Sequence, residues 1–410
     1  MTDFPSDTVF DIAFGALERT PQTLVQGGMT GKLLLVADKN TWTAAGERAC
    51  AILTAAGWSV TSKVFEELES AQMETAQELA ALTLEVGANG ILAVGTGTLN
   101  DLSRYASFLN KIPFAVIGTA ASMDGFCSGV APLIENGFKR TYNAHAPRAV
   151  IGDGSVMDDA PSELTAAGLG DLLGKYTCLA DWKIAHILTG ESFSIELEKM
   201  VRTAVNEAVA AVPSIQAKTS GSTLPLMRAL CLSGVAMALC GSSRPASGAE
   251  HHLSHFWEMR FLQEGRKAIY HGAKVGVATG VVADLYHRLA EIPDITPFLT
   301  TPPKLTRERL LPSCGPIADD ILRDNENDPT STITPEAIAS HWREIRKIID
   351  TIPSSEEIRT LLTALGGPAL PEEIGISPQL KQDGILFGRY VRPRLTLLRL
   401  TDFIQPRAWL

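Results

Sequence analysis

Residues 90–107, GILAVGTGTLNDLSRYAS, decide how the first half of the chain is expected to fold. The apolar run at 90–94 predicts a buried strand, Gly95 and Gly97 predict a tight turn, and the residues after them predict a helix. A helix that begins after a glycine turn presents backbone amides and the positive end of its dipole to an anion. The third glycine of the common dinucleotide fingerprint is missing. The pattern therefore fits either a structural turn or a phosphate cradle.

Apolar runs and helical stretches alternate on both sides of this segment, up to about residue 155. Such alternation predicts an α/β fold with a mostly parallel sheet that helices cover on both faces. Ligands bind at the carboxyl ends of strands in such sheets, which points to the loops after Val94 and Gly118. The predicted strands are 32–38, 58–65, 90–98, 112–119 and 148–156, and the predicted helices are 41–57 and 71–88.

From about residue 156 the chain consists of long periodic segments that are rich in Ala, Leu, Glu and Lys. The last of these segments opens with Thr334 as an N-cap and Pro335 in the first turn. We therefore expect two domains, a dinucleotide-binding α/β domain at 1–155 and an all-α domain at 156–410. The predicted helices are 160–188, 195–212, 275–292 and 334–352, and the polar stretch 322–335 is predicted to be a surface loop.

Composition excludes several classes of protein. The net charge of the 410 residues is −10, and no basic face for nucleic acid is visible. The chain starts with acids where a secretory signal carries basic residues, and its apolar runs are shorter than the roughly 20 residues of a spanning helix. The six cysteines form no C-x-x-C pair and are expected to be reduced and buried. We expect a soluble cytoplasmic protein without nucleic-acid partners or membrane insertion.

Half of the chain's eight histidines lie between residues 251 and 271. In GAEHHLSHF (248–256), His251 and His255 are spaced i,i+4, so they lie on one helix face, as metal-binding pairs do. His252 points about 100° away and is the expected bystander. A fourth imidazole, His271, follows in YHGAK. The spacing cannot choose between His255 and His271 as a ligand, and hydrogen-bonded core imidazoles are the alternative.

Two further segments carry candidate chemistry. AAGLGDLLGKYT (166–177) places Asp171 among small and apolar residues, where a carboxylate needs a metal or an ion pair, for example with Lys175 at i,i+4. One carboxylate and two imidazoles suit zinc, nickel or ferrous iron. IGTAASMDGFCSG (117–129) follows a predicted strand and is rich in hydroxyl side chains. It fits either a cofactor-binding loop or a polar turn in which Asp124 is an Asx-type cap.

Taken together, these motifs resemble one family. GTGTLND (95–101), TAASMDGFCSGVAPL (119–133), AAGLGDLLGKYTCLADW (166–182), SSRPASGAEHHLSHFWEM (242–259) and HGAKVGVAT (271–279) occur in this order. They closely resemble the sn-glycerol-1-phosphate dehydrogenases, particularly the bacterial group associated with arabinose operons. That family belongs to the wider group of iron-containing alcohol dehydrogenases, glycerol dehydrogenases and dehydroquinate synthases. The resemblance extends from about residue 30 to the C-terminal GRYVRPRLTLLRL (388–400).

The resemblance implies a dehydroquinate synthase-like fold with the active site in the cleft between the two domains. It implies that Asp171, His251 and His271 are the catalytic metal ligands, that Asp171 also meets the substrate, and that Asp124 and His255 contact the substrate. The cofactor-binding residues that it implies are Gly97, Thr98, Leu99, Asn100 and Asp101 for the diphosphate and ribose, Thr119, Ala120, Ala121 and Ser122 for the nicotinamide half, and Ser128.

The implied reaction is the reversible reduction of dihydroxyacetone phosphate to sn-glycerol 1-phosphate by NADH or NADPH. The expected partners are this small phosphorylated substrate, one divalent metal per subunit (nickel, zinc or iron) and a second copy of the chain in a homodimer. Lys175, Arg244 and Arg260 lie near the motifs, but the sequence singles out none of them as the phosphate partner. Asp38 is placed to bind the adenosine ribose and disfavour NADP, an effect that Lys39 could soften.

Three other functions compete with this one. The nearest is a dehydrogenase of the same group that acts on glycerol or another unphosphorylated polyol. A lyase or cyclase like dehydroquinate synthase would regenerate its cofactor within each turnover and show no net change in NADH. A degenerate homologue would bind a nucleotide or a partner without catalysis, and a chelator-sensitive NADH signal would exclude it.

Overall fold

The computed structural model describes residues 7–68, 70–135, 138–328 and 330–405. By packing, the chain divides into two compact units, Met1–Leu172 with Thr203–Gly241 and Leu173–Arg202 with Ser242–Leu410. Helix α7 (Ser162–Thr189) is continuous through the division at Leu172. The predicted domain boundary after residue 155 stays a prediction.

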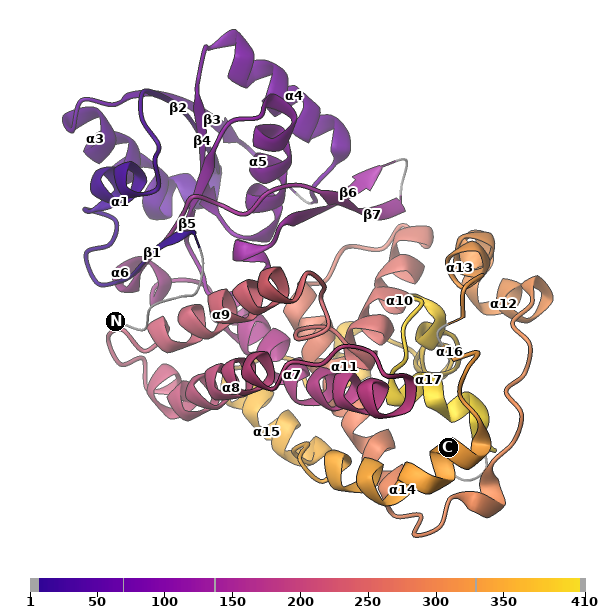
Figure 1. Ribbon diagram of the computed structural model, residues 1–410. Coiled ribbons are helices and arrows are strands. Elements are labelled where there is room, and N and C mark those ends of the chain that lie inside the picture. The colour runs from indigo at the N-terminus through magenta and orange to yellow at the C-terminus, as the bar shows by residue number, and fades with distance from the viewer. Residues whose placement is uncertain (1–6, 69, 136–137, 329, 406–410) are drawn as a thin grey trace. The chain divides into compact units, whose positions relative to one another are not determined.

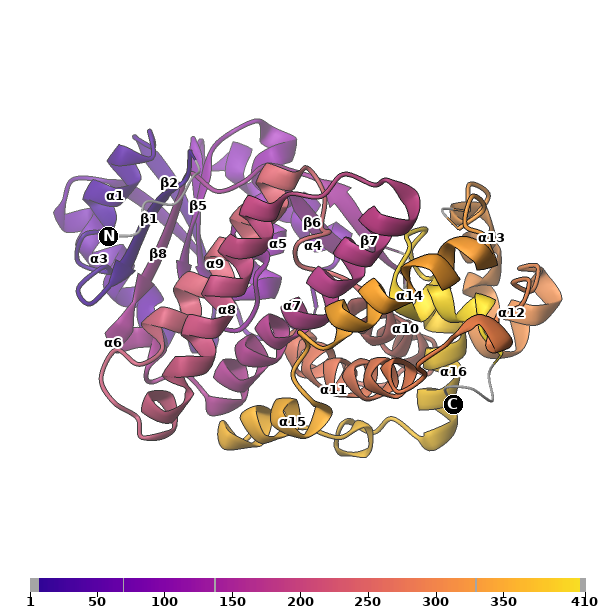
Figure 2. The same cartoon turned by 60° about the horizontal axis from the view of Figure 1, so that its bottom comes forward.

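The first unit is built on one parallel sheet of six strands, in the order β1-β8-β5-β4-β2-β3 (Figures 1 and 2). Every pairing in this sheet is parallel, which confirms the predicted α/β fold. Strands β4, β5 and β8 are buried along their whole length, as expected for continuous apolar runs between two helical layers. The strands are β1 (Val9–Ala13), β2 (Lys32–Asp38), β3 (Ser59–Phe65), β4 (Gly90–Gly95), β5 (Phe114–Gly118) and β8 (Ala149–Asp153).

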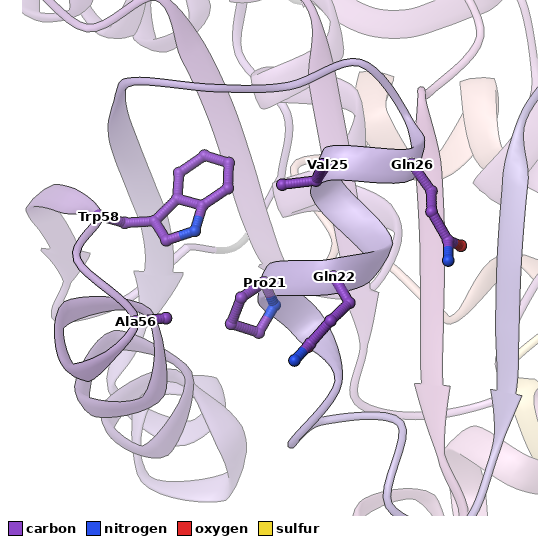
Figure 3. Close-up of a pocket in the computed structure, with 6 residues that line it drawn as sticks. All are labelled: Pro21, Gln22, Val25, Gln26, Ala56 and Trp58. Carbon is purple, nitrogen blue, oxygen red and sulfur yellow. The ribbon is translucent and has the colours of Figure 1, made fainter.

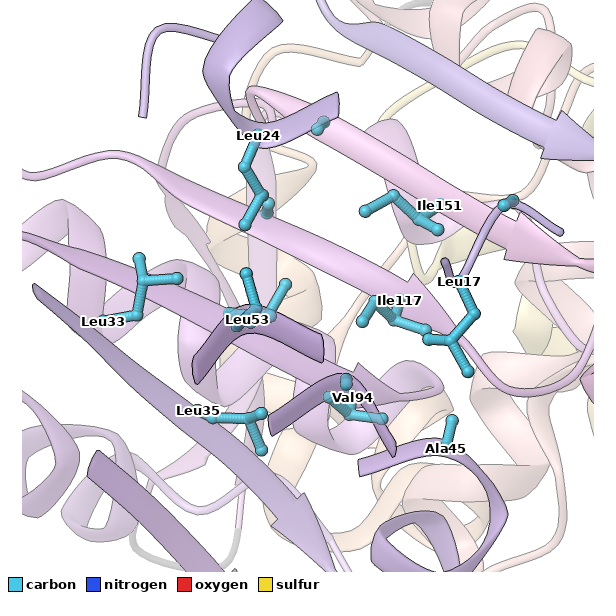
Figure 4. Close-up of a cluster of buried hydrophobic side chains, with 14 of the residues drawn as sticks. Leu17, Leu24, Leu33, Leu35, Ala45, Leu53, Val94, Ile117 and Ile151 are labelled. Atoms are coloured by element: carbon cyan, nitrogen blue, oxygen red, sulfur yellow. The ribbon is translucent and has the colours of Figure 1, made fainter. Parts of the chain in front are cut away.

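Alternate side chains of the strands feed two separate cores, one on each face of the sheet. Leu33 and Leu35 of β2 pack with α1 (Thr20–Gln26) and α3 (Glu47–Ala55), in the cluster drawn in Figure 4. Leu34 and Val36 point the other way. They belong to a second core with residues of α4 (Met73–Glu85) and α5 (Gly97–Asn110). These two cores fix the positions of the loops that follow the strands.

The structure corrects the predicted elements at three places. Strand β1 was not predicted, because its five residues are too short a pattern and Asp11 interrupts them. An antiparallel hairpin, β6 (Val130–Glu135) with β7 (Phe138–Asn143), was also missed. The predicted helix at 41–57 is a composite of α2 (Lys39–Thr41), a π-helical turn at Trp42–Gly46 and α3.

Helices make up the rest of the fold. The first unit also contains α6 (Gly154–Met157), the first part of α7, the later part of α8 (Ile195–Gln216), and α9 (Leu224–Cys240). In the second unit, all helices and strands that the structure describes are of one kind: they are helices, as predicted. Helix α14 begins as the sequence indicates, with Thr334 Oγ1 accepting a hydrogen bond from the Ala337 amide. The helices are α10 (Ala249–Gln263), α11 (His271–Ala290), α12 (Arg307–Cys314), α13 (Ala318–Asp324), α14 (Pro335–Ile349), α15 (Ser355–Ala364), α16 (Pro378–Phe387) and α17 (Leu397–Leu400).

Within the second unit, α10 and α11 pack side by side (Figure 2). The predicted surface loop at 322–335 overlaps the end of α13, and its residue 329 lies outside the described residues. None of the described helices combines the length and the apolarity that crossing a membrane requires.

Candidate metal and cofactor site

The sheet has a topological switch point between the neighbouring strands β2 and β4. The next strand after β2, β3, lies on one side of this pair, and the next strand after β4, β5, lies on the other side. Ligands of open α/β sheets bind at such a point. Two of the predicted residues lie there. Asp38 ends β2 and Gly95 ends β4. The Asp38 carboxylate accepts a hydrogen bond from the Thr41 amide at 2.8 Å, so it caps the short helix α2.

The glycine that ends β4 and the glycine that begins α5 have different structural roles. Gly95 has a positive φ of 157°, and a Cβ there would lie 2.3 Å from Cδ1 of Leu99, so packing inside the protein requires this glycine. A Cβ on Gly97 would meet no atom closer than 3.9 Å, on Met123. No side chain caps the amino end of α5, and no acid lies in its first turn. The start of α5 therefore fits an anionic diphosphate.

The predicted cofactor residues of α5 differ in exposure. Gly97 and Thr98 are half-buried, whereas Leu99 and Asn100 are buried in the unit. Asp101 makes an ion pair of 2.9 Å with Arg104, which is fully buried. Arg104 also donates to three backbone carbonyls at residues 125, 126 and 130. It thereby ties α5 to the loop after β5, a role that the sequence reasoning missed.

The loop after β5 packs closely against two neighbouring helices at positions where each helix has a glycine. A Cβ on Gly168 of α7 would lie 1.9 Å from the Ala121 carbonyl oxygen, and one on Gly234 of α9 would lie 2.8 Å from the Asp124 carbonyl oxygen. The Ser128 hydroxyl lies 3.1 Å from the Val130 amide nitrogen that donates to it. Four predicted cofactor residues are buried in this loop, namely Thr119, Ala120, Ala121 and Ser122.

Asp124 connects this loop to both helices through hydrogen bonds. Its backbone amide donates to Oδ2 of Asp171 on α7 at 2.9 Å. Its carboxylate accepts a hydrogen bond of 2.8 Å from the Ser233 hydroxyl on α9. The side chain makes no capping bond to the short 3₁₀ turn Gly125–Cys127, so the Asx-type cap does not form. Ser233 was not predicted from the sequence.

Asp171, His251 and His271 come together in space. They lie on α7, on α10 and at the first residue of α11, and one potential ligand atom from each lies within 4.8 Å of the others. Asp171 and His251 are buried and His271 is half-buried. One carboxylate and two imidazoles are the donor set of a borderline divalent metal, and three protein ligands leave positions for substrate oxygens or water.

The other two histidines of α10 lie outside this group. The His255 ring is 6.0 Å from the His251 ring and 5.9 Å from the His271 ring. Burial, and then the neighbouring His271, lower the pKa of His255 well below its ordinary value. His255 is therefore a neutral hydrogen-bonding group beside the three. His252 is fully buried, and neither of its ring nitrogens has a hydrogen-bond partner among the described residues.

A buried carboxylate, that of Glu250, contacts Nδ1 of the His251 ring. Glu250 Oε1 lies 2.8 Å from His251 Nδ1 and accepts a 2.7 Å hydrogen bond from the Gly248 amide. Its other oxygen accepts a 2.6 Å bond from the Thr177 hydroxyl on α7. Burial alone would raise the pKa of Glu250, but the hydrogen bond from His251 and the other bonds hold it below its ordinary value. With Nδ1 bonded to a carboxylate, the His251 ring presents Nε2 to a metal.

A second buried acid, Asp181 of α7, holds the start of α10. It accepts hydrogen bonds of 2.8 Å from the Ala249 amide, the Tyr286 hydroxyl and the Leu397 amide. Burial and the nearby Glu250 carboxylate raise the pKa of Asp181 to about 7. Asp181 therefore links α7, α10, α11 and the C-terminal segment within the second unit.

Comparison with known proteins identifies the family. A family model for iron-containing alcohol dehydrogenase matches residues 11–161. The glycerol-1-phosphate dehydrogenase (NAD(P)+) of Geobacillus thermodenitrificans is 34% identical over 371 residues, which are 90% of this chain and 85% of that protein. The enzyme of the same name from Halalkalibacterium halodurans is 35% identical over 387 residues, 93% of this chain and 89% of its own.

The chain belongs to the glycerol-1-phosphate dehydrogenase family. It is therefore an enzyme of the oxidoreductase class. The solved alcohol dehydrogenase of Oenococcus oeni shares the fold, with a TM-score of 0.62 and 16% identity over 100% of both chains.

In this dehydrogenase, the basic residues that the sequence placed near the motifs have partners within the second unit. Arg244 binds both oxygens of Glu191 and donates to the Leu395 carbonyl at 2.7 Å. Arg260 donates to the Ser313 carbonyl at 2.6 Å, and buried Lys175 donates to the Ala246 carbonyl at 3.1 Å.

A hollow of about 400 Å³ on the first unit of this dehydrogenase plays no part in the site. It lies between α1 and the end of α3, as Figure 3 shows, and its lining holds no titratable side chain. Trp58 immediately precedes β3, so the hollow is near the amino ends of the strands, opposite to the edge where ligands bind. The lining residues are Pro21, Gln22, Val25, Gln26, Ala56 and Trp58.

Proposed function

We propose that this protein catalyses the reversible reduction of dihydroxyacetone phosphate to sn-glycerol 1-phosphate by NADH or NADPH, with one bound divalent metal. Asp171, His251 and His271, with ligand atoms within 4.8 Å of one another, carry this proposal. The name that the curated relatives share supports the substrate. Asp171, His251 and His271 would hold the ion, which would supply a positive charge to the oxyanion that develops on the substrate.

The first unit would bind the cofactor at the carboxyl edge of its sheet. The uncapped start of α5, with open space above Gly97, fits the diphosphate. The rigid loop from Thr119 to Ser122 would lie along the nicotinamide half, and Ser128 would contact the cofactor beyond it. Because Gly168 and Gly234 leave no room between this loop and the helices, the loop would hold the nicotinamide in one orientation.

Two side chains would orient the substrate. The Asp124 carboxylate, held by Ser233, would accept a hydrogen bond from a substrate hydroxyl. His255 is held neutral by its surroundings, so its ring would donate or accept a hydrogen bond without adding charge. Asp124 is joined through its amide to Asp171, which ties the substrate contact to the group of metal ligands.

A reconstitution assay tests the proposed function. Metal-depleted protein is mixed with NADH or NADPH and dihydroxyacetone phosphate, and nickel, zinc or ferrous iron is restored in turn. We expect cofactor oxidation that depends on the added metal, with sn-glycerol 1-phosphate and not its enantiomer as the product. Turnover of glycerol alone would instead indicate a polyol dehydrogenase, and conversion of substrate without a net change in NADH would indicate a lyase or cyclase.

A further inference from the structure

Arg104 of α5 reaches from its helix to the loop that follows β5, within the first unit. Its side chain is fully buried and makes an ion pair of 2.9 Å with Asp101. The same guanidinium donates hydrogen bonds to the backbone carbonyls of Gly125 at 2.6 Å, Phe126 at 2.9 Å and Val130 at 3.0 Å. Backbone carbonyls in the interior need donors, and one arginine provides several in a fixed planar arrangement.

The bonds of this arginine fall at both ends of the segment 124–130, which carries two of the predicted ligand-binding residues. The Gly125 carbonyl comes directly after Asp124, and the Val130 carbonyl comes two residues after Ser128. The Ser128 side chain is half-buried, so the middle of the segment stays accessible to a ligand. Both ends of the segment are therefore held to α5, while the part between them can meet the cofactor.

Two further contacts fix the arrangement. The Asn100 amide on α5 donates to the same Gly125 carbonyl at 3.2 Å. The guanidinium carbon of Arg104 lies 5.4 Å from the centre of the Phe114 ring at the start of β5. Because α5 begins at Gly97, where the diphosphate is proposed to bind, this one helix carries the diphosphate site and also holds the segment.

We propose that Arg104 is a positioning residue of the enzyme, which keeps the Asp124 carboxylate and the Ser128 hydroxyl where the substrate and the cofactor meet them. This inference rests on the proposed function. A lysine would keep the positive charge beside Asp101, but its single ammonium group lacks the planar fork that reaches three carbonyls at once. An apolar side chain would remove all of these donors.

The test compares wild type with Arg104→Lys and Arg104→Met in the metal-loaded, full-length protein. Amide hydrogen exchange of the segment 124–130 is measured by mass spectrometry, and NADH affinity by fluorescence titration. We expect faster exchange in Arg104→Lys because the ends of the segment lose donors. We also expect NADH binding about tenfold weaker and a KM for dihydroxyacetone phosphate about tenfold larger, with a smaller change in kcat. Arg104→Met should show larger effects on all three.

The matched control is Arg389→Lys, at a buried arginine of the second unit. Arg389 donates to Thr401, to Asp402 and to the Ile385 carbonyl, so it also binds several acceptors at once. Its replacement should lower the melting temperature about as much as Arg104→Lys does. The NADH affinity, the KM and the exchange of the segment 124–130 should stay at wild-type values.

The outcomes separate this inference from the proposed function. Wild-type exchange, NADH affinity and KM in Arg104→Lys overturn the role of Arg104 and leave the function standing. A lower melting temperature and kcat with unchanged KM and NADH affinity, or failure of Arg104→Lys to fold, also overturn it, because the arginine then only stabilises the fold. If wild type binds NADH but does not turn over dihydroxyacetone phosphate, the proposed function is wrong, while faster exchange and weaker NADH binding in Arg104→Lys still support the inference.

Discussion

Glu250 Oε1 and His251 Nδ1 lie 2.8 Å apart, inside a fully buried network that also includes Thr177 and the Gly248 amide. A carboxylate in this position fixes the tautomer and the orientation of a metal-binding imidazole and makes it a better ligand. Glu250 would thus support the site by holding one of the three proposed ligands, His251.

We predict that Glu250→Gln weakens metal binding about 10–100-fold, because the amide keeps an oxygen acceptor but loses the negative charge behind His251. Competition with a chelator of known affinity measures this directly, without reference to activity. Glu264→Gln, at an exposed acid just after α10, is the control and should bind metal like wild type. Equal affinities in Glu250→Gln and the control would show that Glu250 only fills space.

Substitutions of Gly95, which ends β4, and of Gly97, which begins α5, should distinguish an effect on cofactor binding from an effect on stability. Gly97→Ala has room for its methyl group, so we expect unchanged or slightly raised thermal stability but NADH affinity at least about tenfold weaker, since the methyl group occupies the proposed diphosphate position. Gly95→Ala would collide with Leu99 and should cost about 1–3 kcal/mol of stability. Fluorescence titration with NADH and thermal unfolding measure the two effects. Normal NADH affinity in Gly97→Ala would exclude the start of α5 as the diphosphate site.

Ser233 should act through Asp124. In Ser233→Ala the buried Asp124 carboxylate loses a hydrogen bond of 2.8 Å, so we expect a larger KM for the substrate and a kcat/KM that is about tenfold lower. Metal content and NADH affinity should stay at wild-type values, and Ser233→Thr, which keeps the hydroxyl, should restore part of the activity. A loss of NADH binding instead would assign Ser233 to positioning the cofactor loop.

Asp181 makes a prediction for stability against pH. Its pKa is raised from the ordinary value to about 7 by burial and by Glu250, so the folded protein holds this proton more tightly than the unfolded chain does. The free energy of unfolding should therefore fall as pH rises from about 4 to about 7, with a slope of at most about 1.4 kcal/mol per pH unit from this group. Tyr286 and Glu250 are the titratable groups that face it.

Asp181→Asn should be less stable at low pH but should lose that slope, as denaturant unfolding at a series of pH values would show. Asp294→Asn, at an exposed acid whose pKa is lowered by its hydrogen bonds to Thr296, serves as the control. A variant that kept the full wild-type slope between pH 4 and 7 would assign the proton to another group.

The sequence predicted most of the sheet because its central strands are short, continuous apolar runs that alternate with helical stretches. The elements that it missed are local exceptions. β1 lies at the sheet edge with Asp11 in its centre, and that acid pairs with Arg19. Periodicity cannot detect a π-helical turn such as Trp42–Gly46, since one turn is too short to show an apolar spacing of its own.

Helical spacing grouped His251 with His255 but could not choose between His255 and His271, because the third member of the group begins another helix. Residues that act through long-range contacts carried almost no signal. Glu250 is an acid next to a histidine, and Ser233 is a hydroxyl in an apolar helix. Only their contacts with Thr177 of α7, with His251 and with Asp124 give them a role. The expected homodimer and the cytoplasmic location stay predictions.

The most direct test of the metal site is the metal content of purified protein after dialysis, measured by mass spectrometry for wild type and four single variants. We predict one nickel, zinc or iron per chain in wild type and in His255→Ala, and almost none in Asp171→Asn, His251→Ala and His271→Ala. Loss of the metal from His255→Ala together with its retention in His271→Ala would contradict this ligand set and place the ion on α10 instead.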